Sequence, residues 1–292
     1  KTPFIIMTSF KQQQLIHYTE YPGAEPAIVF VHGFTCDELD WVYQVKHFGI
    51  VGQRIITLDL PGHGKSMSCN SSTLTMKAMA SEVVTMLHHL RVKSTIVVGH
   101  SMGTMIAAEI ATQAPDMVIG VVLIDGSRIA KGDPGEAVAK SNARFEQMGF
   151  KRCITDIFEP MFLPGSDEKE KKRIIDRACA QPEYTSIKIL SSAIRWCAED
   201  FEYKYSQLKV PVQVVQSTHR GEGNKRVPVT SDMHIEWHDE LKTLGVDAEF
   251  DLVADCGHFT MLDKPEVVNT NIERLLERIE AAAAQYSSAS AQ

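Results

Sequence analysis

Short apolar runs alternate with segments of helical periodicity, and this alternation constrains the fold more than any other feature of the chain. Helical patterns at residues 74–90 and 102–114 separate runs that have the length of strands. Such alternation gives right-handed crossovers and a mostly parallel sheet covered by helices. We therefore predict an α/β fold, with residues 4–7 and 15–18 as candidates for an antiparallel edge. The predicted parallel strands are residues 27–31, 54–58, 95–98, 119–124, 212–215 and 249–253.

The alternation stops between residues 128 and 208, where no clear strand is visible. This stretch instead contains four helical patterns, at residues 136–147, 151–158, 168–180 and 184–197. We predict a helical cap at 128–208, inserted into a core formed by residues 1–127 and 209–285. A last helix should begin at Pro265, because proline is tolerated at the first helical position. The small polar residues 286–292 are expected to form a disordered tail.

Charge and composition exclude some functions. The 292 residues carry a formal net charge of −7, so no basic excess is available to bind nucleic acid. No apolar run is long enough to span a bilayer, and no signal peptide is visible at the start. The six cysteines form no CxxC pair and are expected to be free thiols. These features favour a cytoplasmic protein, although a chain that begins with lysine could have lost a leader.

Residues 99–103, Gly-His-Ser-Met-Gly, carry the strongest chemical signal. They match G-x-S-x-G, follow a predicted strand and open a predicted helix, which is the context of a nucleophile elbow. The sharp turn needs small flanking residues, and the helix N-terminus favours negative charge. We therefore predict that Ser101 is a nucleophile.

Two further loops are predicted to complete the site. The turn at residues 32–35, His-Gly-Phe-Thr, follows the strand that ends at Val31. In such sheets this loop and the residue after the nucleophile supply the two N–H groups of an oxyanion hole, here Phe34 and Met102. His258 follows the last strand and precedes the last helix, so it is the candidate general base.

The other histidines give weaker signals. His234 and His238 are four residues apart, but the glutamate between them, Glu236, is not in the position directly after His234 that an H-E-x-x-H zinc site requires. We expect no metal there. His32 and His100 lie near the predicted site and more plausibly shape turns.

Taken together, the ordered segments resemble the α/β-hydrolase superfamily. They are residues 32–33, 59–66 (Asp-Leu-Pro-Gly-His-Gly-Lys-Ser), 99–103 and 257–258. The resemblance extends from about residue 25 to residue 282, apart from the cap. It implies an α/β-hydrolase fold, and within it the 59–66 loop would be scaffold and pocket rim.

The acid that should orient His258 is left open between two residues. The family usually places it after the strand that precedes the last one, and here residues 216–222 contain no aspartate. Glu222 could serve from a longer loop. Asp125 could serve instead from the end of the strand after the nucleophile strand, as in some relatives. Neighbouring strands lie about 4.8 Å apart, so either strand end could bring an acid to His258, and we favour Asp125.

This arrangement predicts an esterase or lactonase that needs neither a metal nor an organic cofactor. Ser101 would attack a carbonyl, His258 would move the proton, and Asp125 would fix the imidazole. Its partner would be a small-molecule ester or lactone, in a pocket with candidate linings Trp41, Phe158, Met161, Phe162 and Trp196.

Other functions on the same fold stay open. Some relatives are cofactor-independent dioxygenases that also place an acid after the strand following the nucleophile strand, although their elbow tends to depart from G-x-S-x-G. Carbon–carbon bond hydrolases are a second alternative. A ligand receptor without turnover is a third, because the fold does not fix the function.

Overall fold

The computed structural model describes residues 16–67 and 70–290, with side chains as far as residue 285. A seven-stranded sheet lies at its centre, and every neighbouring pair of strands is parallel except the pair at the β1 edge. In spatial order the strands are β1 (Tyr18–Tyr21), β3 (Gln53–Leu58), β2 (Ala24–Val31), β4 (Thr95–His100), β5 (Val118–Ile124), β6 (Val212–Gln216) and β9 (Ala248–Leu252). The α/β-hydrolase fold predicted from the sequence is confirmed.

The predicted strands agree with the observed ones to within a few residues. The antiparallel edge is also present, but it starts at Tyr18 and pairs with β3. Residues 4–7 and residue 15 lie outside the described part of the chain. A short hairpin, β7 (Thr218–Arg220) with β8 (Arg226–Pro228), was not predicted. Strands of three residues give too short a pattern to be detected in the sequence.

Apolar side chains pack on both faces of the sheet, which is why its strands are uniformly apolar rather than alternating. On β4, Ile96 and Val98 belong to one apolar cluster, and Val97 belongs to the other. All three are fully buried. The helices that provide the two covering layers are α1 (Val42–Ile50), α2 (Met76–His89), α3 (Met102–Gln113), α8 (Phe201–Ser206), α9 (Glu236–Thr243) and α11 (Pro265–Ser290).

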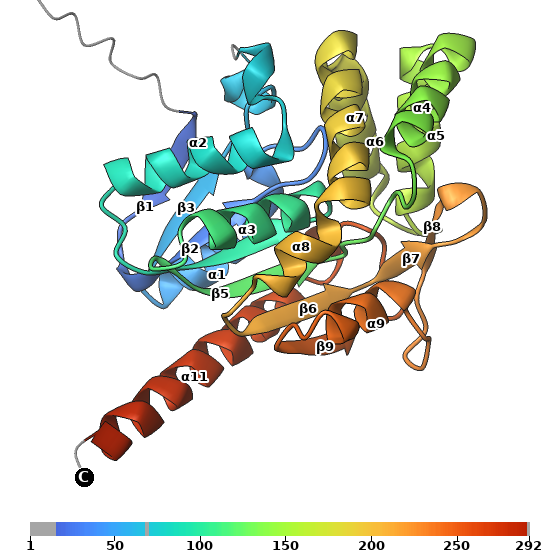
Figure 1. Cartoon of the computed structure of the whole chain (residues 1–292). Coiled ribbons are helices and arrows are strands. Elements are labelled where there is room, and N and C mark those ends of the chain that lie inside the picture. The colour runs from blue at the N-terminus through green and yellow to red at the C-terminus, as the bar shows by residue number, and fades with distance from the viewer. Residues whose placement is uncertain (1–15, 68–69, 291–292) are drawn as a thin grey trace, which may run out of the picture.

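Four helices stand together above one end of the sheet, and we call them the cap helices (Figure 1). They are α4 (Pro134–Met148), α5 (Phe150–Phe158), α6 (Glu168–Ala180) and α7 (Glu183–Glu199). Each matches a helix expected from the sequence. Their N-caps follow familiar rules, since the carboxylates of Asp133 and Asp167 accept N–H groups of the first turns of α4 and α6.

The last helix departs from its prediction. It begins at Pro265 as expected but continues to Ser290, whereas a disordered tail was expected from residue 286. In Figure 1 the helix extends well beyond the sheet. Residues 281–284 are alanines of high helix propensity, and extending an existing helix fixes only one residue for each added hydrogen bond, so the polar composition of the tail was a poor guide here.

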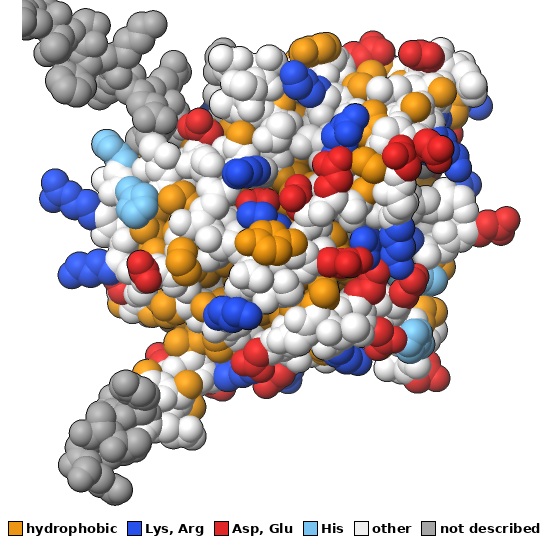
Figure 2. Space-filling view, in the orientation of Figure 1, with side chains coloured by type: hydrophobic (Ala, Val, Ile, Leu, Met, Phe, Trp, Pro, Cys, Tyr) orange, Lys and Arg blue, Asp and Glu red, His pale blue; other side chains and the backbone are white. Residues whose placement is uncertain are grey.

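The surface is mixed in charge. Figure 2 shows acidic and basic side chains interspersed on the visible face rather than gathered in one basic patch. No helix in the described residues is long and apolar enough to cross a membrane.

Candidate active site

Ser101 lies at the sharp turn between β4 and α3. Its backbone has φ +54° and ψ −115°, a conformation that is rare for a residue with a side chain. Glycines on both sides make this turn possible. A Cβ at Gly99 would lie 2.3 Å from the carbonyl oxygen of Gly103, and a Cβ at Gly103 would lie 2.3 Å from that of Val31. The strained turn holds Ser101 at the carboxyl end of the central strand.

His258 lies in the loop between β9 and the short helix α10 (Thr260–Asp263). Its Nε2 is 2.9 Å from Ser101 Oγ, so the hydroxyl can donate to a neutral imidazole. Its backbone is held from two sides, because its N–H donates to the carbonyl of Met161 and its carbonyl accepts from His100 Nε2. His100 therefore supports this loop, in agreement with the turn-shaping role expected from the sequence.

Asp125 follows β5 directly and completes the chain of hydrogen bonds. Its Oδ2 is 2.5 Å from His258 Nδ1. Its Oδ1 accepts the backbone N–H groups of Ser217 and Thr218, at 2.9 and 2.7 Å, and the side-chain amide of Gln216 at 3.0 Å. The carboxylate is fully buried and each of its oxygens has partners. We refer to Ser101, His258 and Asp125 as the Ser101 hydrogen-bond chain.

The structure does not bring Glu222, the second candidate acid, to His258. It lies exposed in the turn between β7 and β8. These strands pair only with each other in the described structure, and their hairpin is not part of the main sheet. Asp125 reaches the imidazole because β5 is the direct neighbour of β4.

Arg226 is part of this site, and sequence reasoning missed it. Its Nη1 lies 3.4 Å from Asp125 Oδ2, and its Nη2 donates to the Asp125 carbonyl at 3.0 Å. Both side chains are almost completely buried. No sequence signal could have identified this contact, because a lone arginine in a polar loop is usually solvated and its partner is 101 residues away.

Burial and neighbouring charges determine the protonation states. Burial alone would raise the pKa of Asp125, but the Arg226 charge and the hydrogen bond with His258 bring that pKa well below its usual range. Burial and then the Arg226 charge lower the pKa of His258, while the hydrogen bond with Asp125 opposes them. The two groups are thus a buried carboxylate and a neutral imidazole at neutral pH.

The loop predicted to form an oxyanion hole passes close to the nucleophile. A Cβ at Gly33 would lie 3.2 Å from Ser101 Cβ, and Phe34 follows on this turn. Met102 is the first residue of α3, where N–H groups lack an acceptor within the helix. Both amides are therefore placed on segments that border Ser101.

The five aromatic and methionine residues proposed as pocket linings fall into two groups. Phe158 and Phe162 stack on Phe259, the neighbour of His258, with ring centroids 6.4 and 5.2 Å away. Met161 holds the His258 backbone, as described above. Trp41 and Trp196 are core residues instead, since Trp41 packs on Phe30 and Trp196 donates to the buried carboxylate of Glu109.

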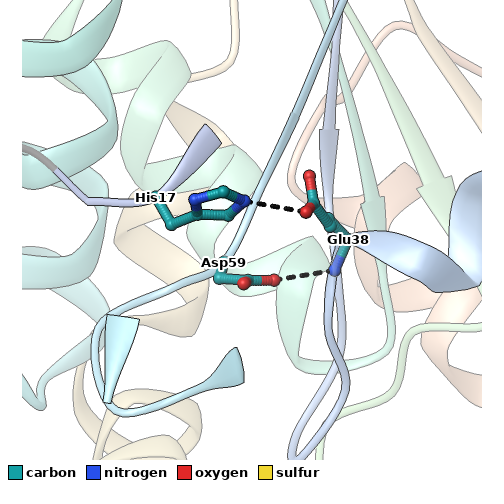
Figure 3. A group of neighbouring side chains, drawn as sticks. All are labelled: His17, Glu38 and Asp59. Carbon is teal, nitrogen blue, oxygen red and sulfur yellow. Dashed lines mark hydrogen bonds and ion pairs between the residues drawn. The ribbon is translucent and has the colours of Figure 1, made fainter. Parts of the chain in front are cut away.

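A second polar cluster links the edge strand to the 59–66 loop (Figure 3). His17 Nε2 lies 2.8 Å from Glu38 Oε1, and Asp59 accepts the Glu38 and Lys65 backbone N–H groups. These three side chains are the only group in the described residues with the spacing of metal ligands. However, the Lys65 ammonium already lies 2.9 Å from Glu38 Oε1 and 3.2 Å from His17 Nε2.

The cluster is therefore complete as an ion network. Burial would raise the pKa of Glu38, but hydrogen bonds from Thr19, Lys65, His17 and Thr57 lower it to about 2. The carboxylate is ionised and fully engaged, so a cation would have to displace the lysine. The 59–66 loop has the scaffold role that its sequence suggested.

His234 and His238 do not form a site together. His234 precedes α9 and forms an ion pair with Asp239, and His238 is buried against Phe250. They are not part of any group with metal-ligand spacing in the described residues.

Comparisons with known proteins give the same family. The model of the alpha/beta hydrolase family matches residues 28–270. Protein ABHD8 of Homo sapiens is 25% identical over 261 residues, which cover 88% of this chain and 57% of that protein. The chain thus spans little more than half the length of this relative.

Solved structures share the fold at low sequence identity. The esterase EaEST from Exiguobacterium antarcticum has a TM-score of 0.72 at 19% identity, with 91% of this chain and 95% of that chain covered. Est816, described as an N-acyl homoserine lactone degrading enzyme, has a TM-score of 0.69 at 22% identity, with 88% and 95% covered.

Proposed function

We propose, from the premise that the chain belongs to the alpha/beta hydrolase family, that it is a serine hydrolase that cleaves a carboxylic ester or lactone. One observation carries this proposal. Ser101 Oγ, the two ring nitrogens of His258 and a buried Asp125 oxygen form one continuous chain of hydrogen bonds, with separations of 2.9 and 2.5 Å. This geometry is what nucleophilic acyl transfer requires.

In the proposed mechanism, His258 Nε2 takes the proton of Ser101 as Oγ attacks the substrate carbonyl carbon. Asp125 keeps the imidazole in the tautomer with the proton on Nδ1 and stabilises the imidazolium that forms. His258 then donates the proton to the leaving alcohol, and the acyl group stays on Ser101. Water, activated by the same histidine, attacks the acyl-enzyme and releases the acid.

The backbone N–H groups of Phe34 and Met102 would stabilise the developing oxyanion. Each such donor contributes about 3 kcal/mol to transition-state stabilisation in related chemistry. The positions of Gly33 beside Ser101 and of Met102 at the helix start support this assignment.

Phe162 and Phe259 support a partly apolar substrate. Phe259 is buried with its ring edge-on to His258, and the partly exposed Phe162 stacks on it, so Phe162 is the ring that an acyl chain or an alcohol group could contact. Similarity of fold to an esterase and to a lactone-degrading enzyme supports the same substrate class.

A panel of chromogenic esters of increasing acyl length, together with several lactones, tests the proposal. Wild type should hydrolyse at least one member, and Ser101→Ala should abolish this activity. Asp125→Asn should reduce it steeply, whereas Glu222→Gln should retain it, because Glu222 is exposed and does not contact His258. If no ester or lactone is hydrolysed, or if Ser101→Ala retains full activity, the proposal is wrong.

The position of the acid favours one alternative, because Asp125 follows β5 as in the cofactor-independent dioxygenases on this fold. That reaction consumes oxygen. Substrate-dependent oxygen uptake with hydroxylated heteroaromatic compounds, in the absence of ester turnover, would select it over hydrolysis.

A further inference from the structure

A separate cavity of about 200 Å³ lies beside Asp125. The loop after β5, the end of β6, the strand β7 and the start of α9 enclose it. Gln216 lines this cavity and also donates to Asp125 Oδ1. Ser101, His258, Phe34 and Met102 do not line it. We call it the Arg220 cavity, and it is distinct from the Ser101 hydrogen-bond chain.

One cation that lines the Arg220 cavity lacks an acidic partner among the residues that the structure describes. Arg128 is paired with Glu240 at 3.2 Å and with Glu202, which is not in the lining, at 3.0 Å. Lys131 is paired with Glu236 and Glu240 at 2.6 and 2.9 Å. Arg220 is different, because no carboxylate pairs with it in the described part of the chain. Arg220 is therefore the cation of this lining whose charge no ion pair in the described residues neutralises.

Arg220 is held in place by neutral groups only. Its Nε donates to Ser127 Oγ at 3.3 Å, and its Nη1 donates to the Asn224 carbonyl at 2.9 Å. The nearby Asp125 is already shared by Arg226 and His258. Burial and the Arg226 charge lower the pKa of Arg220 to about 9, although Asp125 opposes them. A guanidinium in this position would be stabilised by an anion.

The rest of the lining suits an organic molecule. Trp237, which is 5% exposed, and Ile235 provide apolar surface. Two buried polar atoms in the lining residues have no hydrogen-bond partner, Trp237 Nε1 and Gln216 Oε1. Both atoms have almost no solvent-accessible surface, so the polar recognition of a ligand falls to Arg220.

From these observations we propose that the Arg220 cavity binds a small organic monocarboxylate, with its carboxylate on the Arg220 guanidinium. One negative charge matches Arg220, the cation of the lining that has no carboxylate partner in the described residues. A dianion would add repulsion from Glu236 and Glu240. Arginine binds carboxylates well because its planar N–H groups can donate in pairs. The proposal does not depend on the hydrolase activity.

Calorimetric titration with sodium butyrate and with butyramide tests the proposal, at constant ionic strength set by sodium chloride. The two probes have nearly the same shape and differ in charge. Wild type should bind butyrate saturably and should bind butyramide at least about tenfold more weakly, since a charged hydrogen bond is worth more than tenfold in affinity. Equal binding of the two probes, or no binding of butyrate, would overturn the proposal.

Variants locate the binding. Arg220→Gln should weaken butyrate binding about tenfold or more, and Arg274→Gln, which removes an exposed charge on α11, should leave it unchanged. Butyrate affinity that is equal in Arg220→Gln and wild type would place binding elsewhere and contradict the site.

Two other measurements keep the test valid if Arg220→Gln does not fold. Arg220→Lys keeps the charge without the planar guanidinium, so it should bind butyrate more weakly than wild type yet still prefer it to butyramide. Butyrate should also change the tryptophan fluorescence of wild type but not that of Trp237→Phe. A fluorescence change that persists in Trp237→Phe would exclude the cavity.

Discussion

Two aspartates, Asp125 and Asp40, are both completely buried and both contact arginine, yet they serve different regions of the molecule. Asp125, at the end of β5, contacts Arg226 and also His258. Asp40, in the short 3-10 helix Glu38–Trp41 after β2, contacts Arg173 and Arg177 of the cap helix α6, at 3.0 and 2.6 Å. In both cases burial would raise the pKa of the carboxyl, and arginine charge brings it below the ordinary value.

The two aspartates differ in whether one of their charged or ionisable partners can exchange a proton near neutral pH. Arginine stays protonated in proteins, whereas histidine titrates near neutral pH. The cations that contact Asp40 are Arg173 and Arg177. Burial raises the pKa of the other partner of Asp40, the Cys36 thiol, which therefore stays protonated. That cluster holds the cap to the core. Around Asp125 one partner is an imidazole that also contacts a hydroxyl, so that cluster can move a proton. Ionised buried aspartate is thus no sign of catalysis by itself.

The largest expected effect separates the two aspartates by activity. Asp125→Asn should lower kcat of ester hydrolysis by about 10⁴-fold, because the amide no longer fixes the imidazole tautomer or stabilises its cation. Asp40→Asn should retain most of the wild-type kcat, measured on the same ester at a temperature where both variants are folded. A comparable loss in Asp40→Asn would remove the distinction.

The second prediction separates them by stability. Asp40→Asn should lower the free energy of unfolding by about 3 kcal/mol, since breaking a buried ion pair is costly, although Arg177 and Arg173 keep Asp37 and Glu170 as partners. Urea unfolding followed by circular dichroism would measure this. Asp176→Asn is the matched control on α6, where an exposed pair with Lys172 should be worth less than about 0.5 kcal/mol. Equal losses in the two variants would contradict a special role of Asp40.

The third prediction concerns pH and uses one histidine from each region. His32 lies near Asp40 and His100 near Asp125, and burial lowers the pKa of each to about 4. In the unfolded chain both histidines bind a proton below the ordinary pKa of 6.5, whereas in the folded protein they stay neutral. Their contribution to stability is therefore fully present above pH 6.5 and is lost as pH falls toward 4. The free energy of unfolding should fall by about 1.4 kcal/mol for each histidine and pH unit.

Urea unfolding at pH 7, 6 and 5 would test this slope. His32→Asn and His100→Asn should each reduce it, whatever their effect on stability at pH 7. A free energy of unfolding that does not change between pH 7 and pH 5 would show that these histidines are not buried in the neutral form.

The smallest expected effect concerns Arg226. Its charge lowers the pKa of His258, and the general base must be neutral. The pH at which kcat/KM falls to half of its maximum on the acidic side should therefore lie below 6.5 in wild type. It should move to higher pH in Arg226→Met. Arg226→Lys keeps the charge and should keep the wild-type profile. A shift to lower pH in Arg226→Met would mean that the loss of support for Asp125 outweighs the loss of the charge.

Local patterns predicted the fold and pointed to Ser101 and His258, and long-range contacts were the hardest part. Ser101 was recognisable because a strand, a sharp turn and a helix are contiguous in sequence. To place Asp125 beside His258, one must know that β5 lies next to β4. The sequence alone left Asp125 and Glu222 as two candidates for the acid. Glu222 stayed open until the hairpin that carries it was known.

Contacts between distant segments left no signal in the sequence. Arg226 and Asp125 are 101 residues apart, and Arg177 and Asp40 are 137 apart. Neither arginine belongs to a pattern that differs from an exposed polar segment. The helix beyond residue 285 was missed for another reason, because its polar composition indicated a tail whereas the preceding alanines favour a helix that extends into it.

Acyl-enzyme formation tests the central proposal most directly. Wild type would be mixed briefly with an ester from the panel that is hydrolysed, quenched in acid and digested, and the peptide containing Ser101 would be analysed by mass spectrometry. We predict that this peptide gains the mass of the acyl group, that the adduct accumulates to a higher level or persists longer when deacylation is slow, and that Ser101→Ala gains none. Acylation at another residue, or turnover without any adduct under conditions that trap slow esters, would contradict the assignment of Ser101 as the nucleophile.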